Sequence, residues 1–189
     1  MQFEGEFKVA GSPDEVIARF TDIERIARCI PGASIEGRDA DGDYVGAMTV
    51  AFGPKQIRFK GKASCVFDLP KRSGVLKGWA TADLRGSRMQ VRTNFRVRED
   101  SGADLAAPLS IVSISSDAQL GGVLAGFAQT GGAVLADSLM AEFARRLGEE
   151  FANEGPPAAP PTPLSVQALL WSVCRSLWTG FARRFRRRG

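Results

Sequence analysis

The chain has 189 residues, of which 44% are hydrophobic and 24% charged, and its net formal charge is +4. These values indicate one globular domain with a short appendage and exclude a chain that is disordered throughout. Histidine is absent from the sequence, which excludes His-based hydrolase triads and His-containing zinc sites. The three cysteines show no CxxC spacing, so we expect reduced thiols in a cytosolic setting rather than a disulfide framework.

The positive charge is concentrated at the C-terminal end. Residues 164–189 contain six of the 25 basic residues and no acidic residue, so the rest of the chain carries 19 basic and 21 acidic side chains. This distribution argues against nucleic acid as a partner and directs attention to what the tail binds. The N-terminal residues lack the basic and apolar regions of a secretory signal, so we expect a cytoplasmic protein.

The N-terminal part of the chain predicts a strand followed by two short helices. Apolar and polar side chains alternate over residues 2–9, as in a half-buried strand. Ser12 and Glu15 then have the spacing of a capping box at the start of a helix. A second short helix begins at Asp22 and ends at residues 29–32, which read Cys-Ile-Pro-Gly.

Six further strands are predicted from turn signals about every ten residues. Because tight turns join them, consecutive strands should be antiparallel, with one buried face and one solvated face. The arginines and lysines on the solvated face most simply form a solvent-exposed surface, and a docking surface for an acidic partner is the alternative. The predicted strands cover residues 34–39, 43–52, 55–68, 75–84 and 87–98, and the last lies within 104–116.

A long helix with one apolar side is predicted after the strands, beginning near Leu120 and continuing to Leu147. Its uncharged first part, residues 118–136, contains five glycines and several polar residues, which argue against a membrane span. Each glycine costs a helix about 1 kcal/mol relative to alanine. Close packing on the sheet is the simpler reason for these glycines, and space for a ligand between helix and sheet is the alternative.

The C-terminal residues form a separate unit. Residues 153–163 are rich in proline and alanine and predict a semi-rigid linker. In residues 164–189 apolar side chains recur at helical spacing and arginines cluster at the end, which predicts an amphipathic helix lying on a membrane with anionic lipid. The side chains expected to bind the membrane are Leu170, Trp171, Leu177, Trp178, Phe181, Arg183, Arg184, Phe185 and Arg187.

Two other interpretations of the tail remain open. A helix that spans the membrane would bury Arg175 near its middle, at a cost of about 3 kcal/mol. A helix that packs on its own domain or in a groove of a partner would use the same apolar stripe. Nucleic acid is a poorer partner for the arginines, because the neighbouring stripe is too apolar for a solvated basic arm.

The element order predicts an α+β fold, in which a curved antiparallel sheet of about seven strands wraps around a long helix. Such an arrangement leaves a space between sheet and helix that apolar side chains line. No histidine, phosphate-binding glycine loop or inward pair of carboxylates suggests a catalytic site. Tyr44 could bind a polar head group, although a structural role is simpler. The candidate cavity residues are Ile26, Ile30, Met48, Phe59, Met89, Val91, Phe95, Leu120, Leu124 and Phe127.

Several short segments carry a family resemblance over residues 1–150. They are Phe3–Phe7, Cys29–Ala33, Gly53-Pro54 followed by Phe59–Lys62, and Leu120–Gly122 with Gly126. The sequence resembles the family of the carbon monoxide dehydrogenase G subunit, which is part of the START-like (SRPBCC) helix-grip superfamily. It departs from the family pattern at residues 105–116, where a bulge in the last strand is one expectation.

The resemblance implies a non-enzymatic accessory protein. Residues 1–152 would form a helix-grip ligand-binding domain that holds a hydrophobic molecule without a covalent cofactor, and a respiratory quinone (menaquinone or ubiquinone) would fit. The partner would be a cytoplasmic molybdenum hydroxylase of the carbon monoxide dehydrogenase type, linked to the inner face of the cell membrane. An assembly or recruitment factor that carries no ligand is the first alternative. A cyclase-like enzyme is the second, and it would need an acid or base inside the cavity.

Overall fold

The computed structural model describes residues 1–52, 55–84, 86–102, 108–126 and 132–152. One strand, two short helices, six strands and a long helix follow one another in this part of the chain. They are β1 (Gln2–Ala10), α1 (Pro13–Phe20), α2 (Ile23–Cys29), β2 (Ala33–Arg38), β3 (Tyr44–Phe52), β4 (Lys55–Asp68), β5 (Ser73–Ala82), β6 (Arg88–Glu99), β7 (Leu109–Gly121) and α4 (Gly132–Ala152).

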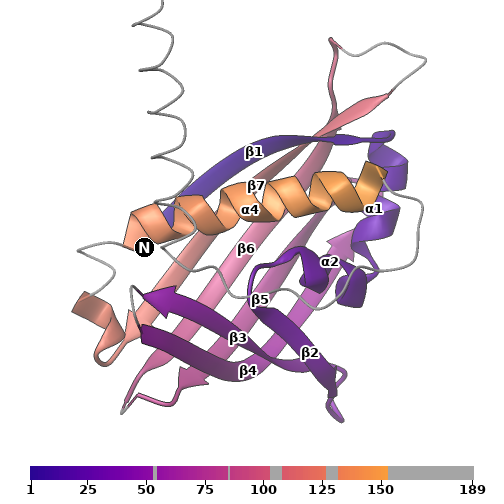
Figure 1. Cartoon of the computed structure of the whole chain (residues 1–189). Coiled ribbons are helices and arrows are strands. Elements are labelled where there is room, and N and C mark those ends of the chain that lie inside the picture. Colours follow the sequence, from indigo (N-terminus) through magenta and orange to yellow (C-terminus); the bar gives the residue numbers. More distant parts are fainter. Residues whose placement is uncertain (53–54, 85, 103–107, 127–131, 153–189) are drawn as a thin grey trace, which may run out of the picture.

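The strands form one antiparallel sheet in the order β1-β7-β6-β5-β4-β3-β2. Strands β2 to β7 are neighbours in chain order, and β1 completes the sheet by pairing with β7. The sheet curves around α4, which lies across one of its faces, while α1 and α2 lie near one end of α4 (Figure 1). This architecture confirms the predicted α+β helix-grip fold with seven antiparallel strands.

The capping box predicted at the start of α1 is present. The Ser12 backbone N–H donates to Glu15 Oε2 at 2.8 Å, and the Glu15 N–H donates to Ser12 Oγ at 3.4 Å. The helix buries Val16, Ile17 and Phe20 against the sheet. Its capped end fixes where this apolar face begins.

The turn after α2 depends on a glycine. Gly32 has a φ of +77°, and a Cβ at this position would lie 2.1 Å from the carbonyl oxygen of Thr49 on β3. Only glycine fits this left-handed conformation and close approach. The Cys-Ile-Pro-Gly segment therefore leads the chain directly from α2 into β2. An ion pair between Arg25 and Glu150 holds α2 against the C-terminal part of α4.

The predicted start of the long helix is wrong. Strand β7 continues to Gly121, so Leu120 is a strand residue, and α4 begins at Gly132. The physical reason is that Ala118 and Leu120 continue the alternation of the strand and turn toward the helix side of the sheet. The expected bulge does not occur in β7, which pairs with β6 without a register shift from Arg88–Gly121 to Glu99–Ser110, while residues 105–107 lie outside the described residues.

Candidate functional site

The hydrophobic core consists of two separate clusters. One lies around α1, α2 and the C-terminal half of α4 and includes Phe20, Phe95, Leu147 and Phe151. The other lies toward the opposite end of α4, around Val50, Phe59 and Leu124, with Met48, Met89, Leu120 and Leu135 packed against it. Side chains do not fill the interior continuously, because a cavity borders both clusters.

This cavity has a volume of about 300 Å³. Its walls come from the inner face of the sheet, from α1 and α2, and from residues 132–143 of α4. Pockets that hold drug-sized ligands have volumes of roughly 300 to 1,000 Å³, so this cavity can hold a small apolar molecule or part of a larger one.

The structure places nine of the ten candidate cavity residues in the lining. Phe127 lies outside the described residues. Two of the nine come from α2 and its C-terminal end, and the strand residues come from β3, β4, β6 and β7. The nine are Ile26, Ile30, Met48, Phe59, Met89, Val91, Phe95, Leu120 and Leu124. That these side chains contact a ligand stays a prediction.

The sequence analysis missed the wall that α4 contributes. Leu135, Ala136, Leu139, Met140 and Phe143 all line the cavity. Their spacing of one, three, one and three residues is that of one helix face, and this signal could have identified them. Glycine also shapes this wall, because a Cβ on Gly5 of β1 would lie 2.9 Å from Met140 Cγ.

The lining contains only two hydroxyl side chains among the described residues, Thr93 on β6 and Ser116 on β7. These residues are register partners on neighbouring strands, and their Oγ atoms lie 2.9 Å apart, within hydrogen-bonding distance. Ser116 is only 3% exposed. The sequence analysis selected apolar residues alone and therefore missed both.

Cys65 is the only ionisable side chain among the described residues that line the cavity. Burial raises the pKa of its thiol to about 11, so the thiol stays protonated and neutral near pH 7. Apart from the N-terminal ammonium of Met1, which donates a hydrogen bond to the carbonyl oxygen of Ala118 at 2.8 Å, the described lining residues offer no carboxylate, imidazole or amine for acid–base chemistry. Tyr44 lies outside the lining, where its hydroxyl accepts a hydrogen bond from Arg38 and its ring stacks under the guanidinium at 4.2 Å.

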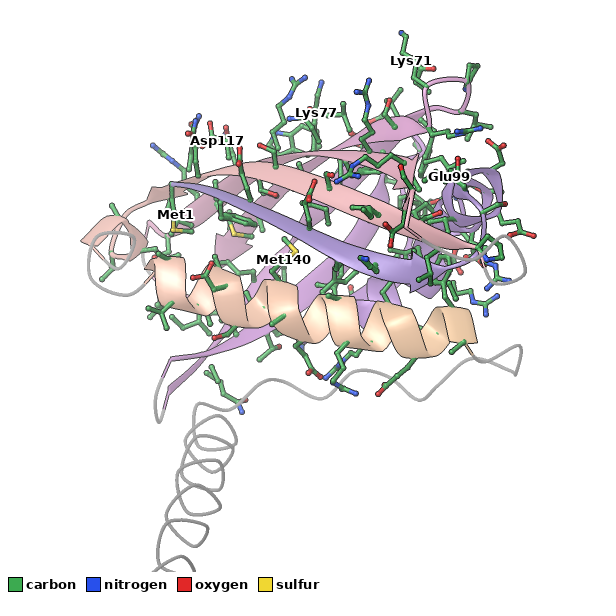
Figure 2. All side chains as sticks on the ribbon, turned by 90° about the horizontal axis from the view of Figure 1, so that it is seen from above. Met1, Lys71, Lys77, Glu99, Asp117 and Met140 are labelled. Carbon is green, nitrogen blue, oxygen red and sulfur yellow. The ribbon has the colours of Figure 1, made fainter. Side chains whose placement is uncertain are left out.

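The outer face of the same sheet has the opposite character. Figure 2 shows Lys77 and Asp117 projecting away from α4, whereas Met140 lies between α4 and the sheet. Lys77 on β5 is the register partner of Arg92 on β6, and neither forms an ion pair within the described residues. We call the exposed cations on β4, β5 and β6 the basic outer face: Arg58, Lys60, Lys62, Lys77, Arg88, Arg92, Arg96 and Arg98.

The described ranges contain neither a membrane span nor a metal site. No helix in this part of the chain is long and apolar enough to span a membrane. Likewise, no three His, Cys, Asp or Glu side chains of the described residues gather as ligands for a metal ion. The linker and every predicted membrane-binding residue lie within 153–189, outside the described part, so the amphipathic tail stays a prediction.

The comparison with protein families gives a match over most of the chain. The model of the family of the carbon monoxide dehydrogenase G subunit (CoxG) matches residues 5–153. The chain belongs to this family. The matched residues include every strand and helix that forms the cavity of this CoxG-family protein, apart from the first residues of β1. Among curated proteins, none matches the chain.

Solved structures share the fold of this CoxG-family protein at low sequence identity. A conserved protein from Geobacillus kaustophilus has a TM-score of 0.66 and 16% identity over 80% of this chain and 95% of its own. The Zhui aromatase/cyclase from Streptomyces sp. R1128 has a TM-score of 0.53 and 15% identity over 79% and 93%. Norcoclaurine synthase from Thalictrum flavum has a TM-score of 0.51 and 16% identity over 79% and 84%. These likenesses establish the START-like helix-grip fold.

Proposed function

We propose that this protein is a non-enzymatic carrier of a hydrophobic molecule, and that it links a cytoplasmic molybdenum hydroxylase of the carbon monoxide dehydrogenase type to the membrane. The observation that carries the proposal is the apolar cavity between the two core clusters. Membership of the CoxG family supports the choice of partner enzyme. A respiratory quinone is the proposed cargo, because it would connect a soluble oxidoreductase to the electron carriers of the membrane.

The physical argument for a protein carrier is the hydrophobic effect. Transfer of one CH₂ group from an apolar environment to water costs about 0.8 kcal/mol, so a quinone with an isoprenoid chain does not leave the bilayer for water unaided. A cavity with an apolar lining offers an environment closer to that of the bilayer. The predicted tail helix would keep this cavity close to the membrane surface.

The character of the lining favours a carrier over a cyclase-like enzyme. Cyclisation of a bound substrate needs a group that moves a proton or stabilises a developing charge. The ionisable groups of the described lining residues are the neutral thiol of Cys65 and the N-terminal ammonium of Met1, which is held by the carbonyl oxygen of Ala118 and by Asp117. The aromatase/cyclase and norcoclaurine synthase likenesses concern the fold alone.

The cargo proposal is tested by filling the cavity. Ala136 is buried in the lining, whereas Ala141 is exposed on the same helix. Titration calorimetry of the full chain with menadione should give saturable binding for the native protein and for Ala141→Phe, and at least tenfold weaker binding for Ala136→Phe. A native protein that binds no menadione would overturn the carrier function and leave the ligand-free recruitment or assembly factor.

The membrane proposal is tested by vesicle flotation. The full chain should float with vesicles that contain phosphatidylglycerol, and a chain that ends at residue 163 should not. Each basic side chain near an anionic surface contributes about 1 kcal/mol, so binding to neutral phosphatidylcholine vesicles should be weaker. Equal flotation of the two chains would contradict the tail as the membrane-binding element.

A further inference from the structure

One row of side chains crosses the inner face of the sheet and forms part of the cavity wall. It runs over five strands, because Cys65 on β4 pairs with Leu76 on β5, Leu76 with Thr93 on β6, Thr93 with Ser116 on β7, and Ser116 with Phe3 on β1. All five residues line the cavity. The hydroxyl pair therefore lies in the row with an apolar side chain on each side.

The hydroxyl groups of Thr93 and Ser116 have one more donor than their mutual hydrogen bond uses. Two hydroxyl groups carry two protons, and the bond between Thr93 Oγ1 and Ser116 Oγ uses one of them, whichever group is the donor. Neither side chain makes another hydrogen bond with the described residues. One O–H group thus has no acceptor there, although Ser116 is almost fully buried.

Another inward serine on β7 shows that the fold can satisfy such a group. Ser110 is completely buried, and its hydroxyl donates to the carbonyl oxygen of Gly11 at 2.8 Å. It lies outside the cavity lining. A buried donor without an acceptor costs roughly 1–3 kcal/mol, and buried polar groups in native proteins are rarely left in that state. The Thr93–Ser116 pair differs from Ser110, because one of its two O–H groups has no acceptor among the described residues.

We infer that the Thr93–Ser116 pair is the polar anchor of the cavity and donates one hydrogen bond to a carbonyl oxygen of the cargo. This inference rests on the proposed carrier function and narrows its ligand class. The cargo is a molecule with an apolar body and a hydrogen-bonding oxygen, placed against β6 and β7 with apolar walls around the rest. Because hydroxyl groups also accept hydrogen bonds, the same pair can bind the hydroxyl group that reduction makes from this carbonyl.

Two probes of similar shape separate the polar anchor from the apolar walls. Menadione has carbonyl groups, and 2-methylnaphthalene has none. We expect the double variant Thr93→Val/Ser116→Ala, made in the full chain, to bind menadione about five- to tenfold more weakly than the native protein, which is the effect of one hydrogen bond. Its affinity for 2-methylnaphthalene should stay within about twofold of the native value. Each single variant keeps one hydroxyl and its proton, so it should retain most of the preference for menadione.

The control variant is Thr81→Val, which makes the same chemical change at an exposed position on β5. It should leave the binding of both probes unchanged. A second measurement needs no variant at all: the infrared carbonyl stretch of menadione bound to the native chain should lie at a lower frequency than in hexane, as expected for a carbonyl that accepts a hydrogen bond.

The outcomes distinguish this inference from the function on which it rests. Selective loss of menadione binding in the double variant, with a lowered carbonyl frequency in the native protein, supports the anchor. If the native protein binds both probes, and the double variant changes both equally or neither, the anchor is wrong while the carrier function stands. If the carbonyl stretch of menadione bound to the native protein had the same frequency as in hexane, this result would contradict the anchor even if the double variant failed to fold. If the native protein binds neither probe, the carrier function itself fails.

Discussion

The inner and outer faces of the one sheet are built from alternate residues of the same strands, yet they have opposite chemistry. On β6, Val91 and Thr93 line the cavity, whereas Arg92 between them belongs to the basic outer face. Among the described residues, the cavity lining includes no charged side chain, and the outer face places Lys77 directly opposite Arg92. The comparison teaches that strand alternation alone separates an apolar cavity from a charged, solvent-exposed surface.

The largest expected effect comes from exchanging the chemistry of the two faces. Val91→Asp would place a carboxylate without a partner in the apolar lining, and we expect it to lower the free energy of unfolding by about 3–5 kcal/mol. Arg92→Asp, one residue away, should change it by less than about 0.5 kcal/mol, because attraction to Lys77 on β5 is offset by repulsion from Asp117 on β7, and all three side chains are exposed. Urea denaturation of both variants measures the contrast, and equal losses would contradict the assignment of the faces.

A second prediction compares the filled and hollow parts of the interior. Leu147 on α4 is completely buried in the first core cluster, whereas Leu139 on the same helix borders the cavity. Leu147→Ala should cost about 2–4 kcal/mol through lost burial and a new void. Leu139→Ala should cost only about 1–2 kcal/mol, because its side chain already faces empty volume. If Leu139→Ala proved the more destabilising in urea, the space beside it would be filled in solution.

The smallest effect concerns a charge on α4 away from both faces of the sheet. Hydrogen bonds from Arg145, together with one from Arg146, lower the pKa of Glu142 from 4.5 to about 2. A lowered pKa in the folded state contributes stability that is present above about pH 4.5 and is lost as the pH falls toward 2. Because the ion pairs are partly solvated, we expect Glu142→Gln to cost about 1 kcal/mol at pH 7.

The pH dependence provides the measurement for these ion pairs. As the pH falls from about 4.5 toward 2, the stability of Glu142→Gln should fall less steeply than that of the native protein. Asp137→Asn is the matched control, because Asp137 is exposed on α4 and forms no ion pair within the described residues. A Glu142→Gln profile parallel to the native one would mean that this carboxylate is not stabilised by its arginines.

Sequence patterns predicted the sheet well because strand alternation is a local signal. The alternation in β6 placed Thr93 on the same face as Met89, Val91 and Phe95, but only the three apolar residues were selected as cavity residues. The start of the long helix was harder to predict from the sequence. The run after Ala118 is uncharged and rich in glycine, so it lacks a clear period that separates strand from helix.

The cavity itself could be predicted only in outline. Its volume depends on how far α4 lies from the sheet, and contacts between distant residues fix that distance, such as the approach of Met140 to Gly5 and the ion pair between Arg25 and Glu150. No local pattern encodes these contacts. The pairing of Thr93 with Ser116 likewise depends on the register between β6 and β7. The prediction of a membrane-binding tail rests on the sequence pattern alone.

The central claim is that the cavity carries an apolar cargo, and native mass spectrometry of the full chain tests it most directly. Protein purified without detergent from cells that make quinones should retain one bound apolar molecule, which organic solvent extracts and which has the absorbance of a quinone. Ala136→Phe, prepared in the same way, should retain none, and Ala141→Phe should match the native protein. A native chain with the mass of the polypeptide alone, and with no uptake of menadione, would contradict the account.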